Sequence, residues 1–366
     1  MRHWIWDWCL QGVVSVMPPL INIAGRPIGP ECPPYIIAEL SANHNGSLNS
    51  ALSIIDKAAE AGATAVKLQT YRADTITLNS DRAEFKITEG KWAGQTLYEL
   101  YESAFTPWDW HKELFDRANA VGVTMFSSPF DQSAVDFLED LNAPAYKIAS
   151  FEAVDIPLIR YVAGTGKPMI ISTGMADAEE IAEAIETARD AGCKELAILH
   201  CVSGYPAPPS DYNLRLIPDM MERFKLVTGL SDHTLDNTTA IAAVALGSSI
   251  IEKHVTLNRN GGGPDDSFSL EPQELNQLCV SAKIAWKSIG TVDYGPKASE
   301  RANIMFRRSL YFVKSLKAGE LITSDCLRSI RPGFGAAPKH FDKIIGKRVL
   351  VDIKAETPVS LADIAI

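Results

Sequence analysis

Three features are missing from this chain of 366 residues, and each absence excludes a class of protein. The six cysteines are scattered without a C-x-x-C pair, which excludes the common zinc-ribbon and thioredoxin spacings and predicts reduced, intracellular thiols. No stretch of about 18 uninterrupted apolar residues occurs, so no membrane span is predicted. A basic excess is also missing, because the formal net charge is −10, and this disfavours a nucleic-acid partner. We therefore expect a cytoplasmic protein that binds neither nucleic acid nor membrane.

The first residues do not fit the rest of the chain. Arg2 and an apolar run suggest a leader, but Asp7 interrupts the run and no A-x-A cleavage site follows. We interpret residues 1–19 as an N-terminal extension and expect translation to start at Met17. Hydrophobic content of 46% and charged content of 22% are typical of a globular protein. The length suits one barrel-sized domain of roughly 250 residues and a small second domain.

Short apolar runs alternate with amphipathic stretches over most of the chain. The amphipathic stretches start near Asn or Asp and end on Gly, as helix caps do. Eight β-then-α units in series predict a (β/α)₈ TIM barrel over residues 20–290. The alternative is a doubly wound open sheet, but no phosphate-cradling glycine fingerprint follows the first run. The eight predicted strands are 35–40, 65–70, 123–128, 143–150, 168–174, 196–202, 225–231 and 249–255.

Two segments lie outside this repeating pattern. Residues 71–106 form a longer connection than a βα loop needs, and are either a functional loop or a packed excursion over the barrel rim. Residues 291–302 are predicted to be a basic linker. Residues 303–366 contain short β segments with Gly and Pro turns, which predict a small independent domain.

Polar and charged side chains gather where the predicted strands end. Barrel enzymes place their catalysts at these C-terminal strand ends, whereas a purely structural barrel has no need of them there. We therefore expect an active site at this end of the barrel. Its candidates are Glu39, Lys67, Gln69, Ser127, Ser128, Lys147, Ser150, Glu152, Ser172, His200, Ser231, His233, Lys253 and His254.

Two histidines among these candidates could bind a metal. His233 and His254 follow the seventh and eighth runs, which are neighbours in a barrel, so their imidazoles can converge on one divalent ion. Glu39, across the barrel closure, is a candidate third contact, directly or through water. Either histidine alone is more often a satisfied core or rim residue, but their shared position favours a metal site.

Two lysines point to an anionic substrate. Lys67 and Lys147, together with nearby serine hydroxyls, suit a small dianion that carries phosphate and carboxylate. In the alternatives, one lysine extends to solvent, or one is a Schiff-base nucleophile as in a class I aldolase. The histidine pair argues against the Schiff base, because a metal would already activate the carbonyl.

The loop after the last run is rich in glycine. Three glycines and Pro264 allow a tight turn that would bring Asp265 or Asp266 over the barrel end. A carboxylate there could bind sugar hydroxyls or assist a proton transfer. The alternative is that one of these aspartates simply caps the following helix.

Ordered motifs along the chain resemble the sialic acid synthase family, whose members condense phosphoenolpyruvate with an amino sugar. The final module, with KAGELIT and IRPGFG, resembles the antifreeze-like or SAF domain that caps these synthases. The resemblance runs from about residue 20 to the end of the chain. The matching motifs are IAELSANHNGSL, AVKLQT, YKIASFE, STGM, HCVSGYPAP, GLSDHT, EKHVTL and GPDDSFSLEP.

The resemblance implies roles for individual residues. His233 and His254 would bind a divalent metal, usually manganese in this family, with magnesium or cobalt as alternatives. Arg331 matches a residue of the cap that reaches into the partner subunit's site, which implies a domain-swapped homodimer. Glu39 is the candidate base or cation stabiliser. The implied phosphoenolpyruvate contacts are Lys67, Ser128, Lys147, Ser150, Ser172 and Ser231, and the implied sugar-side residues are Glu39, Gln69, Glu152, Tyr205 and Asp265.

Within the family, two segments resemble the pseudaminic acid branch. They are residues 97–115 and the GGPDDSFSLEP form of the loop after the last run. This branch implies 2,4-diacetamido-2,4,6-trideoxy-L-altrose, a diacetamido-deoxyhexose, as the sugar. A legionaminic acid or N-acetylneuraminate synthase is the alternative, and a Schiff-base pyruvate lyase is a remote one. A non-catalytic sugar-binding module would not need two lysines and two histidines at strand ends.

Overall fold

The computed structural model describes residues 19–90 and 92–365, so the predicted start at Met17 lies outside the described residues. The chain divides into two compact units, which meet in sequence between Gly290 and Thr291. Each unit has its own hydrophobic core. In the part of the chain that the structure describes, no helix combines the length and the apolarity that a membrane crossing requires.

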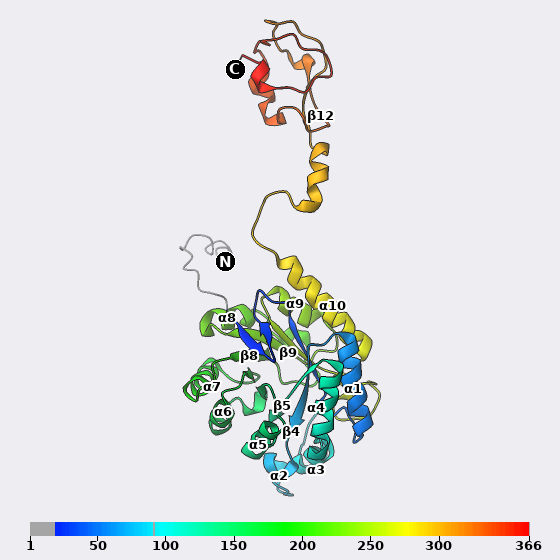
Figure 1. The fold of residues 1–366 in the computed structure, drawn as a ribbon, viewed down its shortest axis with the longest axis vertical. Helices are drawn as coiled ribbons and strands as arrows, with labels where there is room; N and C mark the ends of the chain where they lie inside the picture. The colour runs from blue at the N-terminus through cyan, green and yellow to red at the C-terminus, as the bar shows by residue number, and fades with distance from the viewer. Residues whose placement is uncertain (1–18, 91, 366) are drawn as a thin grey trace. The chain divides into compact units, whose positions relative to one another are not determined.

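The first unit is built on eight parallel strands that close into a barrel, as Figure 1 shows from the side. Consecutive strands are neighbours, and the last pairs with the first, His254 lying opposite Glu39. The predicted TIM barrel is thus confirmed, and the open doubly wound alternative is wrong because the sheet has no free edge. The strands are β3 (Tyr35–Glu39), β4 (Ala65–Thr70), β5 (Thr124–Pro129), β6 (Tyr146–Ile148), β7 (Met169–Ser172), β8 (Leu196–Cys201), β9 (Val227–Asp232) and β10 (Ile250–His254).

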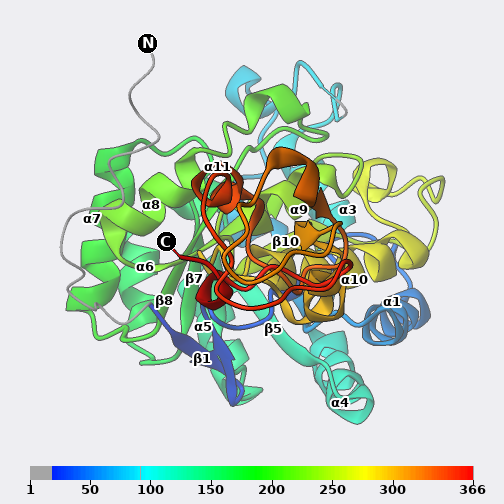
Figure 2. The same cartoon turned by 90° about the horizontal axis from the view of Figure 1, so that it is seen from above.

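Helices surround the barrel, and Figures 1 and 2 show α6, α7 and α8 together along one side of it. Capping residues define their ends: the Ser47 hydroxyl accepts from Ser50 N at the start of α1, and Gly62 ends this helix at φ 90°. Apolar helix faces and outward strand residues form the main core. The larger helices are α1 (Leu48–Ala61), α4 (His111–Val121), α5 (Gln132–Asp140), α6 (Ile156–Ala163), α7 (Ala178–Asp190), α8 (Leu216–Phe224), α9 (Thr238–Ala245) and α10 (Pro272–Ile289).

Successive residues of each barrel strand face opposite sides of the sheet. In β10, Ile250 belongs to the apolar cluster inside the barrel, whereas Ile251 belongs to the core under the helices. The same alternation holds in β8, where Ala197 and Leu199 face inward. It therefore decides which polar residues at the strand ends can meet.

A β-hairpin closes the barrel at the N-terminal ends of its strands. Strands β1 (Ile21–Ile23) and β2 (Arg26–Ile28) pair across Ala24 and Gly25, whose φ values of 51° and 80° suit a two-residue hairpin turn. Isoleucines from both strands join the apolar cluster inside the barrel. The interior is therefore filled with apolar side chains from this hairpin up to the polar strand ends.

The long connection between β4 and β5 is a packed excursion. It contains α2 (Ala73–Ile76) and α3 (Leu97–Ala104), with a short antiparallel bridge between Lys86 and Thr96. Tyr71 anchors it, because its ring lies 5.8 Å from that of Tyr101 in an edge-to-face contact.

The second unit is small and rich in β structure. Strands β11 (Ser309–Phe312) and β12 (Leu327–Ile330) pair antiparallel, and a short helix, α11, spans Phe341–Ile344. Its core includes Leu310, Phe312 and Ile344, which are fully buried. A 3₁₀ helix over Ala298–Phe306 precedes the first strand.

Candidate functional site

Two lysines and two glutamates meet inside the barrel at the C-terminal ends of its strands, which we call the mouth. The Lys67 ammonium lies 2.6 Å from Glu39 Oε2 and 3.8 Å from Glu252 Oε1. Lys147 Nζ donates to both carboxylate oxygens of Glu252 at 3.0 Å. All four side chains are at least 95% buried. The mouth therefore holds two positive and two negative groups shielded from water.

Glu252 was not among the residues predicted from the sequence, although it lies in the quoted EKHVTL motif. Strand alternation could have found it, because Glu252 is two residues from both Ile250 and His254 and so faces the interior with them. Its carboxylate also accepts from Ser231 Oγ at 3.3 Å.

The electrostatics of the four groups are strongly coupled. Burial raises the pKa of Glu39 and outweighs the opposite effect of Lys67. Burial would also raise the pKa of Glu252, but Lys147 and Lys67 together hold it below its usual value. Burial lowers the pKa of Lys147 despite the Glu252 carboxylate. Glu39 is thus the carboxyl of this group that takes up a proton most readily.

Glu39 continues into a second set of polar contacts. Gln69 Nε2 donates to Glu39 Oε1 at 3.0 Å and to Ser41 Oγ at 3.1 Å. Ser41 Oγ in turn donates to Asp265 Oδ2 at 2.5 Å. Sequence reasoning did not single out Ser41, which follows β3 and has a positive φ of 47°.

The predicted histidine pair does come together. The rings of His233 and His254 have centroids 5.4 Å apart, and Tyr205 lies against His233 with a centroid separation of 4.4 Å. His233 Nδ1 is 2.8 Å from the carbonyl oxygen of Val202. His254 Nδ1 lies 3.7 Å from Asp265 Oδ2.

These histidines suit a metal with few protein ligands. Burial holds the pKa of His254 well below its usual value, which favours the neutral imidazole that metals bind. For His233, contact with Cys201 outweighs burial and raises the pKa, so a metal there competes with a proton. Among the described residues no group of three or more His, Cys, Asp or Glu side chains is placed to hold a metal. Glu39 as a third contact, directly or through water, stays a prediction, and water or substrate oxygens would supply the other ligands.

The predicted serines lie around the lysines. Lys67 Nζ donates to Ser128 Oγ at 3.3 Å, and Ser150 Oγ accepts from Gly174 N at 3.2 Å. Ser172 is 1% exposed, and its hydroxyl has no hydrogen-bond partner within residues 19–90 and 92–365. Ser172 thus offers a buried hydroxyl to a ligand.

Three other candidates at the strand ends face away from the mouth. Ser127 Oγ bonds to Thr70 Oγ1, and His200 bonds to the Tyr212 carbonyl. Lys253 donates to Asp232 Oδ2 at 2.9 Å and to the carbonyl oxygens of the loop after β9. The prediction that these three residues belong to the active site is wrong, because each is one residue out of phase with the inward-facing positions of its strand.

The glycine-rich loop after β10 carries Asp265 into the mouth and Asp266 away from it. Asp266 is 1% exposed and accepts from Asn45 Nδ2 at 2.9 Å and Gly263 N at 2.8 Å. The N-cap of α10 is Glu271, so neither aspartate caps that helix.

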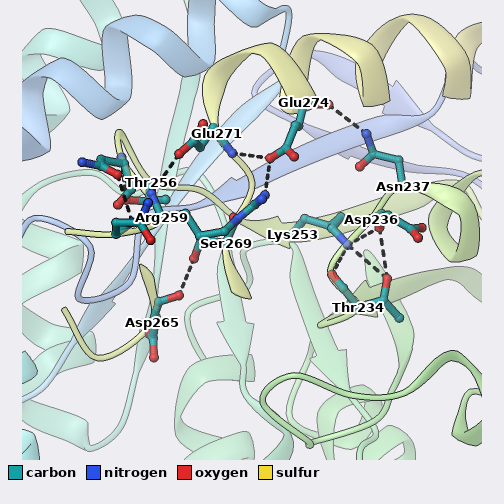
Figure 3. A network of polar contacts seen from close by, with 12 residues as sticks. Thr234, Asp236, Asn237, Lys253, Thr256, Arg259, Asp265, Ser269, Glu271 and Glu274 are labelled. Atoms are coloured by element: carbon teal, nitrogen blue, oxygen red, sulfur yellow. Dashed lines mark hydrogen bonds and ion pairs between the residues drawn. The ribbon is translucent and has the colours of Figure 1, made fainter. Parts of the chain in front are cut away.

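A polar network behind β10 anchors the same loop, as Figure 3 shows. Arg259 Nε donates to the Ser269 carbonyl at 3.1 Å, and its guanidinium pairs with Glu274 of α10. Asn237 Nδ2 donates to the Glu274 carbonyl at 2.9 Å. The loop is therefore tied to the start of two helices, which fixes the position of Asp265.

Glu152 lies in a 3₁₀ turn after β6, close enough to Lys147 and Lys67 for their charges to act on its carboxyl. It is partly buried, and burial raises its pKa to about 7. Arg331 belongs to the second unit, where it follows β12 and is exposed. Its role at a partner's site stays a prediction.

Comparison with known proteins gives a consistent result over most of the chain. Residues 54–294 match the NeuB family and residues 307–365 match the SAF domain. A pseudaminic acid synthase from Campylobacter jejuni is 42% identical over 87% of this chain and 93% of its own length.

More distant relatives share the same architecture. An N,N'-diacetyllegionaminic acid synthase from Legionella pneumophila is 34% identical over 91% of this chain and 95% of its own length. The crystal structure of an N-acetylneuraminic acid synthetase from Leptospira borgpetersenii superposes with a TM-score of 0.70 at 32% identity. That alignment covers 78% of this chain and 95% of the crystallised one.

Proposed function

This chain belongs to the NeuB family, and we propose that it is a pseudaminic acid synthase, because its higher identity is to a pseudaminic rather than a legionaminic acid synthase. The reaction would join phosphoenolpyruvate and 2,4-diacetamido-2,4,6-trideoxy-L-altrose and add water, to give pseudaminic acid and phosphate. The observation that carries the proposal is the pairing of Lys67 and Lys147 with buried carboxylates next to two imidazoles.

Phosphoenolpyruvate is the substrate that suits the two lysines. Its phosphate and carboxylate would take ammonium donors now held by Glu39 and Glu252, since charge-assisted hydrogen bonds are strong and short. The surrounding hydroxyls of Ser128, Ser150, Ser172 and Ser231 would bind the remaining oxygens.

The sugar would lie on the side of the mouth formed by Gln69, Glu152, Tyr205 and Asp265. His233 and His254 would hold a divalent metal, manganese, magnesium or cobalt, which would supply Lewis acidity toward the sugar aldehyde. The fixed loop after β10 would orient the sugar through Asp265.

The chemistry then proceeds in three steps. The methylene carbon of phosphoenolpyruvate forms a C–C bond with the aldehyde carbon, whose oxygen takes up a proton and becomes a hydroxyl. Water adds to the cationic enol-phosphate carbon and gives up one proton, which replaces the proton taken up by the aldehyde oxygen and for which Glu39 is the proposed base. The C–O bond to phosphate then breaks, the new hydroxyl gives its proton to the departing phosphate, and the keto group of the product forms.

Phosphate release with three sugars tests the substrate. The enzyme is incubated with phosphoenolpyruvate and the altrose derivative, the legionaminic precursor or N-acetylmannosamine. We expect the altrose derivative to give the highest kcat/KM, and a higher value for either other sugar would support the corresponding alternative synthase. Borohydride with pyruvate distinguishes the lyase, because only a Schiff-base enzyme is trapped irreversibly.

Chelation tests the metal. Removing divalent ions should abolish phosphate release, and manganese should restore it. A His254→Asn variant should bind manganese more weakly by calorimetry, which is a readout independent of turnover. Full activity of the metal-free enzyme would contradict a Lewis-acid role.

Subunit mixing tests the proposed domain-swapped homodimer. A chain with Arg331→Ala and a chain with Lys147→Ala should each be inactive alone. If Arg331 acts in the partner's site, each mixed dimer has one complete site, so about a quarter of all sites should be active after exchange of equal amounts. No recovery after proven exchange would contradict the swap.

A further inference from the structure

A groove beside the mouth has no part in the reaction described above. Its volume is about 440 Å³. One wall comes from the excursion after β4, with Trp92, Gln95, Leu100 and Ser103. The other comes from the glycine-rich turn, residues 261–264, together with Asn45. The groove thus lies between two loops that both border the site.

The groove reaches the reacting centre through short contacts. The Trp92 ring lies 6.0 Å from Tyr205, which packs on His233 at 4.4 Å. On the other wall, Pro264 directly precedes Asp265, whose carboxylate bonds to Ser41 in the mouth. A substrate held at the two histidines could therefore extend a substituent into the groove.

The lining selects a neutral group. Among the described residues that line it, none is charged: the polar side-chain groups are amides, a hydroxyl and the Trp92 indole. Leu100 and the indole ring add apolar surface. An amide with a small methyl group matches this combination, because it has one acceptor, one donor and one apolar end.

Trp92 supplies a hydrogen-bond donor that is not yet used. Its indole nitrogen is buried and has no partner within the described residues. Buried polar groups are almost always paired, so an unpaired donor beside an open groove indicates a missing acceptor.

The opposite wall is held in place. A Cβ on Gly263 would lie 1.8 Å from Asn45 Oδ1, and one on Gly261 would lie 2.5 Å from Asp266 Oδ2. Only glycine permits this approach, and the Asn45–Asp266 hydrogen bond of 2.9 Å fixes it. The groove is therefore a preformed feature on this side.

We propose that this groove binds an acetamido substituent of the amino sugar, with Trp92 and Gln95 donating to its carbonyl oxygen and Leu100 packing on its methyl group. The proposal rests on the function proposed above, and it names the part of the site that distinguishes a diacetamido sugar from a sugar with one acetamido group. The lysines and histidines select the reaction, and the groove selects the substituent.

Steady-state kinetics with two sugars test the groove. The probes are the diacetamido altrose and its analogue with a hydroxyl in place of the 4-acetamido group, tested as substrate or competitive inhibitor. Trp92→Phe keeps the ring but removes the N–H, and Ser103→Tyr fills the groove. Thr88→Ala is the matched control, exposed on the same excursion but outside the lining.

We expect Trp92→Phe to lower kcat/KM for the diacetamido sugar by about 2- to 10-fold, the loss of one neutral hydrogen bond. Ser103→Tyr should lower it further. The analogue's KM or inhibition constant, the KM for phosphoenolpyruvate and the Thr88→Ala kinetics should stay unchanged. Unchanged discrimination in both groove variants would overturn this inference alone. A wild-type enzyme that does not use the diacetamido altrose would overturn the proposed function, and with it the groove's role toward this sugar.

Discussion

Individual side chains in the mouth work as partners rather than singly. Glu252 holds Lys147 through both carboxylate oxygens and reaches Lys67 at 3.8 Å. Breaking a buried ion pair leaves an uncompensated charge, which costs far more than the pair itself contributes. Glu252 therefore positions both lysines before a substrate anion arrives.

Replacing Glu252 with Gln tests this role. We expect the free energy of unfolding to fall by about 3–5 kcal/mol, because two buried ammoniums lose a carboxylate. Turnover should fall on the order of 100-fold as the lysines move. Urea unfolding and phosphate release measure the two effects. Glu60→Gln, in an exposed pair with Lys57, is the control and should change neither.

Glu152 predicts a pH dependence of stability. Its folded-state pKa is about 7, whereas the unfolded chain loses this proton near pH 4.5. Between these values the folded state binds more protons, so its stability falls as pH rises. From about pH 4 to about pH 8, the wild type should lose at most about 3 kcal/mol relative to Glu152→Gln. Urea unfolding at both pH values checks this, and a constant difference between the two proteins would refute it.

Much of the site could be predicted from the sequence, because strand ends in a barrel share one face. The pairing of His233 with His254, and of Lys67 with Ser128, follows from this rule. Predicting which way each side chain points requires the exact strand register as well, since a shift of one residue reverses the direction. That is why Lys253 was included and Glu252 was not.

At the scale of elements, buried polar contacts fix the loops that the strands carry. Lys253, in β10, donates to Asp232 at the end of β9 and to Thr234 and Asp236 in the loop that follows; Figure 3 shows the contacts with this loop. One ammonium thus connects β10, which ends at His254, to the end of β9, which His233 directly follows.

Lys253→Met should destabilise the enzyme by about 3–5 kcal/mol, because it leaves the fully buried Asp232 carboxylate without its cation. Adding Asp232→Leu should recover part of this loss, since no unpaired charge then remains. Urea unfolding of the single and double variants measures both. Lys287→Met, at an exposed position of α10, serves as the control. Equal stability of Lys253→Met and wild type would rule out a stabilising role for the contact between Lys253 and Asp232.

Elements with long periodic patterns were predictable, and short ones were not. All eight strands were located, but β6 covers only Tyr146–Ile148 of a predicted run of eight residues. The hairpin of β1 and β2 has strands of three residues, too short for an alternating pattern to show. Its stability comes from packing inside the barrel, which a local sequence cannot reveal.

At the scale of the whole molecule, the chain combines two separately cored units. Every residue from Gly290 to Arg308 is exposed, and four of them, Lys297, Arg301, Arg307 and Arg308, are trypsin sites. Exposed connections between compact units are the preferred sites of proteolysis.

Brief trypsin treatment should therefore cut first between residues 297 and 308 and release two fragments that correspond to the units. Mass spectrometry identifies the cut, and circular dichroism tests whether each fragment keeps its fold. An enzyme with Gln at all four basic positions should resist this first cut. Initial cleavage within the barrel would contradict the division.

The hairpin at the N-terminal ends of the barrel strands affects how substrates enter the enzyme and how products leave it. Because Ile21, Ile23 and Ile28 close one end, the barrel is open only at the mouth. Substrates must therefore enter, and products leave, through the mouth. In the proposed reaction, phosphate would be released beside the lysines and would leave past the sugar acid or after it. We therefore expect inorganic phosphate to compete with phosphoenolpyruvate. We also expect the product bound nearer the mouth opening to leave before the one bound deeper in the barrel.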